Sequence, residues 1–261
     1  MKHFIVGSGW KMVKTYQDSI ETARDLEKKL AGFHDFPVVI FPSFPAIPEI
    51  CRHLSADSAL KIGGQDMFWE EEGAYTGEVS GKMLLEIGCK YVEINHQERR
   101  KYLHEDNKMS NKKLKLALRL GLIPFLCMGE EERGTEEDVQ NFIRHQLDEL
   151  LEGVDAEEAS GIIFAYEPRW GIGKKNAVPL DHIQTVHRGI RNILKERYGD
   201  KTADHAYIVY GGGITMERSL DIAALPDVNG LFTTGCGIYA DLYSRLVWDT
   251  AEMLRQQGGN K

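Results

Sequence analysis

The 261-residue sequence lacks a hydrophobic run as long as the roughly 20 residues that a transmembrane helix needs. It begins MKHFIVGSGWKM, without the basic, apolar and small-residue regions of a secretory signal, so we expect a cytoplasmic protein without a membrane partner. Its four cysteines are scattered and form no CxxC pair, which argues against a zinc site or a disulfide framework. The net charge of −8 argues against a nucleic-acid-binding surface.

What the sequence does contain is a regular alternation of short β-branched runs with longer charged, amphipathic segments. In residues 19–30 and 136–151 the apolar side chains, Phe142 among them, recur at helical spacing, and Thr135 is a suitable N-cap for the second segment. We expect strands in eight runs, at residues 3–7, 37–41, 60–64, 90–94, 122–127, 161–166, 206–210 and 230–234.

Strict alternation of strands and helices predicts a parallel sheet, because parallel neighbours need a crossover connection. Eight such units in about 250 residues match a closed (β/α)8 barrel, whereas a doubly wound sheet has fewer strands and often a GxGxxG turn after the first. Here the first run is followed by GSGWKM, which lacks that turn. We therefore predict an α/β protein with one TIM (β/α)8 barrel domain spanning residues 1–261.

Polar residues and glycines that follow the predicted strands are the candidate site, because active sites of such barrels lie at the carboxyl ends of the strands. Taken singly, a lysine or histidine there could equally be a solvated or structural residue, and the glycines could be ordinary turns. The candidates are Lys11, His96, Glu98, Glu167, the glycines at 211–213, and Gly235 and Gly237.

The stretch GIIFAYEPRWGIGKK at residues 161–175 places a carboxylate at the end of an apolar run. Pro168 and the glycines that follow favour a loop over a helix. We therefore expect Glu167 to be held by a rigid strand in front of a segment that can move.

Several stretches in order along the chain resemble the triosephosphate isomerase family, over essentially the whole length. They are WKM at 10–12, GAYTGEVS at 73–80, His96 with ERR at 98–100, CMGE at 127–130, YEPRWGIG at 166–173 and YGGGI at 210–214.

This resemblance implies an aldose–ketose isomerase that acts on a short phosphorylated sugar through an enediolate and needs no metal or cofactor. It implies that Glu167 is the base and His96 the electrophile, a pairing for which this family is itself the standard example. Lys11 would be the substrate-binding cation, and Glu98 either its partner or simply an acid at the start of a helix.

The resemblance also implies a phosphate site and a lid. The lid would run from 168 to 178 and close over the substrate, keeping water from the reactive intermediate. Phosphate or substrate would be bound by Gly9, Gly173, Gly212, Gly213, Gly235 and Cys236, and the lid would include Pro168, Arg169, Trp170, Gly171, Ile172 and Lys174.

Departures from the family pattern lie in the cavity wall. The family typically has Asn where this chain has Gly9, and Ser where it has Gln97 and Gly213; the lid sequence GIGKKNAV also differs. Gly9 would leave room for a longer substrate. Two substrate classes therefore stay open, the triose phosphates and a four-carbon erythrulose phosphate as in a known offshoot of the family. A non-catalytic barrel that binds a phosphorylated metabolite is a third possibility.

The segment FWEEEGAYTGE resembles the family's projecting third loop. It implies that Thr76 and Gly77 contact a second copy of the chain and steady its site, so we expect a homodimer. The alternative is a mobile surface loop.

Overall fold

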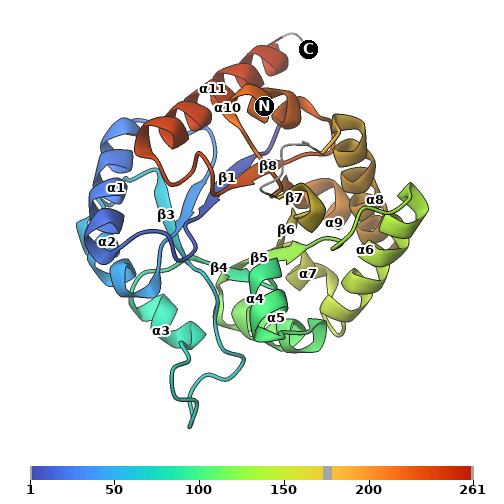
Figure 1. Ribbon diagram of the computed structural model, residues 1–261, viewed down its shortest axis with the longest axis horizontal. Helices are drawn as coiled ribbons and strands as arrows, with labels where there is room; N and C mark the ends of the chain where they lie inside the picture. Colours follow the sequence, from blue (N-terminus) through green and yellow to red (C-terminus); the bar gives the residue numbers. More distant parts are fainter. Residues whose placement is uncertain (1, 173–177, 260–261) are drawn as a thin grey trace.

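Eight parallel strands close into a barrel in chain order, with β1 paired to both β2 and β8 (Figure 1). The computed structural model describes residues 2–172 and 178–259. The strands are β1 (Ile5–Gly9), β2 (Val38–Phe41), β3 (Leu60–Gly64), β4 (Tyr91–Ile94), β5 (Ile123–Met128), β6 (Ile163–Tyr166), β7 (Tyr207–Tyr210) and β8 (Gly230–Thr233). Each lies within two residues of a predicted run, and the predicted TIM-barrel fold class is confirmed.

Helices surround the barrel on its outer side (Figure 1). The predicted N-cap is present at Thr135, whose side chain and that of Asp138 form a capping box. Phe142, predicted on the apolar face of that helix, is instead 36% exposed. The helices are α1 (Tyr16–Lys29), α2 (Ile47–His53), α3 (Gly81–Glu86), α4 (Gln97–Leu103), α5 (Asn107–Leu120), α6 (Glu136–Leu150), α7 (Ala156–Ala159), α8 (Leu180–Tyr198), α9 (Asp200–His205), α10 (Met216–Ala224) and α11 (Ala240–Gly259), with 3-10 turns η1 (Phe44–Ala46) and η2 (Arg169–Gly171).

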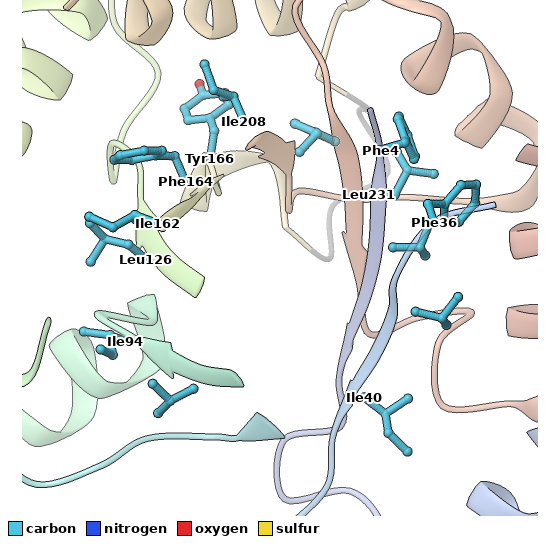
Figure 2. Close-up of a cluster of buried hydrophobic side chains, with 14 of the residues drawn as sticks. Phe4, Phe36, Ile40, Ile94, Leu126, Ile162, Phe164, Tyr166, Ile208 and Leu231 are labelled. Carbon is cyan, nitrogen blue, oxygen red and sulfur yellow. The ribbon is translucent and has the colours of Figure 1, made fainter. Parts of the chain in front are cut away.

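The core has two layers because successive strand residues point to opposite faces of the sheet. On β5, Phe125 and Cys127 point into the barrel, where they join Phe41 and Phe232. Leu126 points outward into the larger layer between strands and helices, part of which Figure 2 shows. An acidic residue that points into the barrel would therefore lie among apolar side chains.

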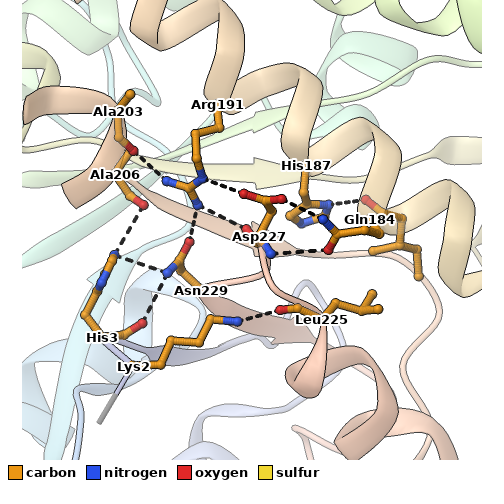
Figure 3. A network of polar contacts seen from close by, with 11 residues as sticks. Lys2, His3, Gln184, His187, Arg191, Ala203, Ala206, Leu225, Asp227 and Asn229 are labelled. Atoms are coloured by element: carbon orange, nitrogen blue, oxygen red, sulfur yellow. Dashed lines mark hydrogen bonds and ion pairs between the residues drawn. The ribbon is translucent and has the colours of Figure 1, made fainter. Parts of the chain in front are cut away.

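A polar network joins the amino ends of β1, β7 and β8 to helix α8 (Figure 3). Arg191 donates to the carboxylate of Asp227 at 2.8 Å and to the side-chain oxygen of Asn229 at 2.5 Å. Asn229 in turn contacts the ring of His3 and donates to its carbonyl oxygen. This network lies at the rim opposite the carboxyl ends of the strands, where barrels carry stability rather than chemistry.

Within the residues described, no helix is both long enough and apolar enough to cross a membrane.

Candidate active site

A cavity of about 520 Å³ opens at the carboxyl ends of the strands. Most of the predicted catalytic and substrate-binding residues meet there: Lys11, His96 and Glu167 contribute side chains, and the glycines after β7 contribute backbone. Its described lining is Gly9, Lys11, Glu93, His96, Glu167, Gly171, Ile172, Gly211, Gly212, Gly213, Ile214, Thr215, Arg218, Phe232, Thr233, Thr234 and Gly235.

Glu167 directly follows β6, and the alternation that turns Ile163 and Ala165 into the barrel turns it inward as well. Its backbone N–H donates to the carbonyl of Met128 at 2.7 Å and so remains tied to β5. A Cβ on Gly129 would stand 2.2 Å from the carbonyl oxygen of Glu167, and one on Gly211 would stand 2.6 Å from its Cγ. Glycine at these two positions is what allows the acid to lie where it does.

The carboxyl group of Glu167 is 4% exposed, and its Oε2 has no hydrogen-bond partner among the described residues. Burial raises its pKa to about 8, although the charge of Lys11 acts in the opposite direction. A carboxylate with so high a pKa is a stronger base than one in water.

His96 is the N-cap of α4, with its ring buried beside Glu167. The backbone N–H of Glu98 donates to Nδ1 at 3.3 Å, so Nε2 carries the proton of the neutral ring. Burial and the charge of Lys11 lower the pKa of His96 to about 4. Nε2 lies 3.6 Å from Glu167 Oε2, which makes it a neutral donor next to the buried acid.

Lys11 adopts a left-handed backbone with φ of 50° just after β1. Gln65, which the sequence analysis missed, donates to the carbonyl oxygens of Lys11 and Phe41 at 2.8 and 2.9 Å and holds this turn. The ammonium group of Lys11 donates to Glu98 Oε1 at 2.8 Å. Burial lowers the pKa of Lys11, but the bond to Glu98 and the nearby carboxylates outweigh it, so the pKa is raised on balance. Glu98 thus pairs with Lys11 and also lies in the first turn of α4.

A third buried acid, Glu93 on β4, faces the same space and is also missing from the sequence candidates. Its Oε1 lies 3.7 Å from His96 Nε2. Glu93, His96 and Glu167 each offer one ligand atom within 4.8 Å of the others, so these are the residues that could hold a divalent cation.

Residues that follow β7 and β8 form another part of the described lining. Gly212, Gly213 and Gly235 line it as predicted, together with Arg218 on α10. Nη2 of Arg218 donates to the carbonyl of Val178 at 2.6 Å, and its Nη1 is buried without a hydrogen-bond partner among the described residues. Glycine N–H groups, a helix start and a guanidinium form a set that suits a phosphate group.

Cys236, predicted among the phosphate-binding residues, is not part of the described lining. Its thiol points toward the hydroxyl of Thr233 at 3.4 Å, and the side chain is 5% exposed. The neighbouring residues Thr234 and Gly235 line the cavity in its place.

The first part of the predicted lid forms η2, and Gly171 and Ile172 reach the cavity. A Cβ on Gly213 would stand 3.1 Å from the carbonyl oxygen of Gly171, so glycine there permits a close approach of this segment. Gly173 and Lys174, as well as the lid departures at 175 and 176, lie outside the described residues.

Glu130, the first of three consecutive acids, anchors this segment. It is 4% exposed and accepts from Trp170 Nε1 at 2.6 Å and from the Tyr166 hydroxyl at 2.9 Å. Pro168 precedes η2, and the Arg169 guanidinium donates to Glu131 at 2.5 Å. The residues around Glu167 are thus fixed on both sides of the strand end.

Thr76 and Gly77 lie in the segment between β3 and α3, which projects from the rim of the barrel (Figure 1). Both are exposed, and the base of the segment is closed by a hydrogen bond from the Phe68 N–H to the Val79 carbonyl at 2.8 Å. A second hollow of about 450 Å³ lies beside Lys11 and is lined partly by Met12, Tyr102 and Leu103, all strongly exposed apolar side chains.

Comparison with known proteins gives a consistent result. The family model described as triosephosphate isomerase matches residues 4–249. The triosephosphate isomerase of Dictyoglomus thermophilum is 36% identical over 251 residues, covering 95% of this chain and 99% of that protein. Those of Caldanaerobacter subterraneus subsp. tengcongensis and Moorella thermoacetica are 37% and 38% identical, covering 95% of this chain and 99% and 98% of those proteins.

Proposed function

The chain belongs to the triosephosphate isomerase family, and from this premise we propose that it interconverts dihydroxyacetone phosphate and glyceraldehyde 3-phosphate with Glu167 as the base. The observation that carries the proposal is the pairing of a buried, partly unsatisfied carboxyl group with a neutral imidazole donor 3.6 Å away. Aldose–ketose isomerisation needs both, since a proton leaves one carbon while negative charge develops on the oxygens.

In this reaction Glu167 removes a proton from the carbon beside the carbonyl group and returns it to the neighbouring carbon. His96 donates from Nε2 to the oxygen that becomes negative, and the ammonium group of Lys11 adds a fixed positive charge. Glu98 keeps that ammonium group in place. No redox partner is required, because the two carbons exchange oxidation state within one molecule.

The phosphate group binds in the part of the cavity lined by residues that follow β7 and β8, with Gly212, Gly213 and Gly235 providing backbone and Arg218 a charge. Because Arg218 also bonds to the carbonyl of Val178, phosphate binding is linked to the end of the lid. Lid closure then excludes water from the enediolate, whose phosphate would otherwise be lost by elimination.

A four-carbon ketose phosphate is the second candidate substrate, and one observation favours it. Gly9 lines the cavity where any side chain would narrow it, since a Cβ there would stand 3.2 Å from the ring of Phe232. The same catalytic groups can act on either substrate, because in both the proton moves between the carbonyl carbon and the carbon next to it.

The test of the base is Glu167→Gln, which keeps the shape and removes the proton acceptor. We expect kcat to fall by about 10²–10⁴-fold, which is the contribution of a general base that its amide cannot replace. Binding of inorganic phosphate, measured by calorimetry, should persist. Glu157→Gln, at an exposed acid on α7 before the amino end of β6, is the matched control and should leave both unchanged. A chain that binds phosphate with no turnover in the unmodified protein would be a binding protein instead.

We further propose that two copies form an isologous homodimer, in which the projecting segment with Thr76 and Gly77 enters the hollow beside Lys11 of the partner copy. The exposed apolar side chains of Met12, Tyr102 and Leu103 support this, because such a patch is usually covered by a partner. We also propose a role in central carbohydrate metabolism, in glycolysis or gluconeogenesis, and a cytoplasmic location.

A further inference from the structure

Glu93 is the acid in this cavity to which the isomerisation gives no role. It lies on β4 in the inward alternation with Tyr91, among the apolar side chains that fill the barrel, and is 5% exposed. Burying a carboxyl group among aromatic and aliphatic side chains is costly unless it gains a partner.

Within the described residues, protein contacts leave Glu93 poorly satisfied. Its one hydrogen bond there is a weak contact from the Cys127 thiol to Oε1 at 3.9 Å. The distance of 3.7 Å from Oε1 to His96 Nε2 is longer than a hydrogen bond. The carboxyl group therefore retains capacity to bind a ligand that enters the cavity it lines.

Gly9 is what leaves this carboxyl group accessible. A Cβ built on Gly9 would stand 3.6 Å from Glu93 Oε2, and it would also touch the Phe232 ring at 3.2 Å. A longer side chain at position 9 would thus cover the carboxyl group of Glu93. It would either bond to Oε2 or fill the space beside it. Glycine and the buried acid together form a small polar recess in the cavity wall, which we call the Glu93 recess.

We propose that Glu93 is a substrate-binding residue whose carboxyl group binds a hydroxyl group on a carbon that a three-carbon substrate lacks, so that the Glu93 recess admits phosphorylated sugars of at least four carbons. This inference rests on the proposed function, because it uses the same base and phosphate end of the cavity. It adds which group of the substrate is recognised, a hydroxyl group, and which residue binds it, Glu93.

The ionisation of the site agrees with this role. Burial, then the charge of Glu167, raises the pKa of Glu93 well above its ordinary value, and Lys11 offsets only part of this. The raised pKa favours the protonated form of Glu93, which can both donate to and accept from a hydroxyl group. A neutral acid also adds no second negative charge beside Glu167 when that base ionises.

The experiment compares three substrates with three forms of the protein. The substrates are dihydroxyacetone phosphate, a four-carbon ketose phosphate, and the analogue of the latter that lacks the hydroxyl group on the added carbon. The proteins are the unmodified chain, Glu93→Leu, which removes the hydrogen bond at similar volume, and Glu93→Gln, which keeps a donor and an acceptor. Circular dichroism and thermal unfolding check that each variant folds.

We expect the unmodified chain to lose about 10²-fold in kcat/KM when the hydroxyl group is missing, because a buried polar group left unpaired is strongly penalised. Glu93→Leu should lower kcat/KM for the four-carbon substrate by a similar factor and remove most of the difference between it and its analogue. The same variant should lose less kcat/KM on dihydroxyacetone phosphate than on the four-carbon substrate, so that the ratio of the two values falls. Glu93→Gln should restore most of the discrimination.

Equal losses on all three substrates in Glu93→Leu would overturn the inference, since they would mean that Glu93 only supports the site. So would an unmodified chain that turns over dihydroxyacetone phosphate and ignores the four-carbon substrate; the proposed function would then stand. Absence of turnover with every substrate would overturn the proposed function and this inference with it.

Discussion

At the scale of single residues, the chemistry depends on two buried groups whose pKa values are shifted in opposite directions. Burial raises the pKa of Glu167 to about 8 and lowers that of His96 to about 4. Between about pH 4 and pH 8 His96 is therefore a neutral donor. Glu167 in the empty site becomes charged only as the pH approaches about 8. The pH dependence of the reaction should therefore follow Glu167.

We predict that kcat/KM rises about tenfold per pH unit below pH 7 and levels off above about pH 8, because the base must lose its proton before it can accept one. Steady-state rates between pH 5.5 and 9.5 with dihydroxyacetone phosphate measure this. A flat profile across pH 6 to 9 would mean that another group controls the base.

The sequence predicted some of the site residues that follow strands, but it did not predict Glu93 or Gln65. Lys11, His96 and Glu167 each follow an apolar run closely, so the barrel rule found them. Glu93 lies within its run and was counted as part of a buried strand. Gln65 acts through backbone carbonyls of distant residues, and no local pattern in the sequence signals such contacts.

At the scale of elements, the segment after β6 is held by Glu130, which follows β5. Although burial raises the pKa of Glu130, the nearby ring of His182 and the hydrogen bonds from Trp170 and Tyr166 lower it on balance. Sequence patterns place the helices and strands well, because periodicity reports burial. They missed this anchor because its partners are brought together only by the fold.

We predict that Glu130→Ala lowers the free energy of unfolding by about 2–4 kcal/mol, because it removes the acceptor that the Tyr166 hydroxyl and the Trp170 indole N–H share. It should also lower kcat, since η2 loses its attachment. Urea denaturation and steady-state kinetics measure the two effects. Glu132→Gln, an exposed acid in the same loop, is the control; if the two variants behaved alike, Glu130 would not be the anchor.

At the scale of the whole molecule, the barrel separates stability from chemistry. The network of Arg191, Asp227 and Asn229 lies at the amino ends of the strands, and the acids and glycines of the site lie at the carboxyl ends. The alternation of strands and helices was enough to predict this arrangement. It could not supply the assembly, which depends on surfaces that the periodic pattern does not describe.

We predict that deleting residues Tyr75 to Glu78 yields monomers with little activity, because the projecting segment would no longer fill the hollow beside Lys11 of a second copy. Light scattering after size exclusion gives the mass, and kinetics gives the turnover. A deletion variant that is monomeric with full activity would show that the site is complete in one copy.

The central claim, that the chain isomerises a short sugar phosphate by proton transfer at Glu167, is tested most directly by a proton NMR time course in deuterated buffer. One tube holds dihydroxyacetone phosphate and another holds an erythrulose phosphate. We predict isomerisation with uptake of deuterium at the carbon beside the carbonyl group, and its loss in Glu167→Gln. Protein-dependent isomerisation that persists in that variant, or no reaction in either tube with the unmodified protein, would contradict the claim.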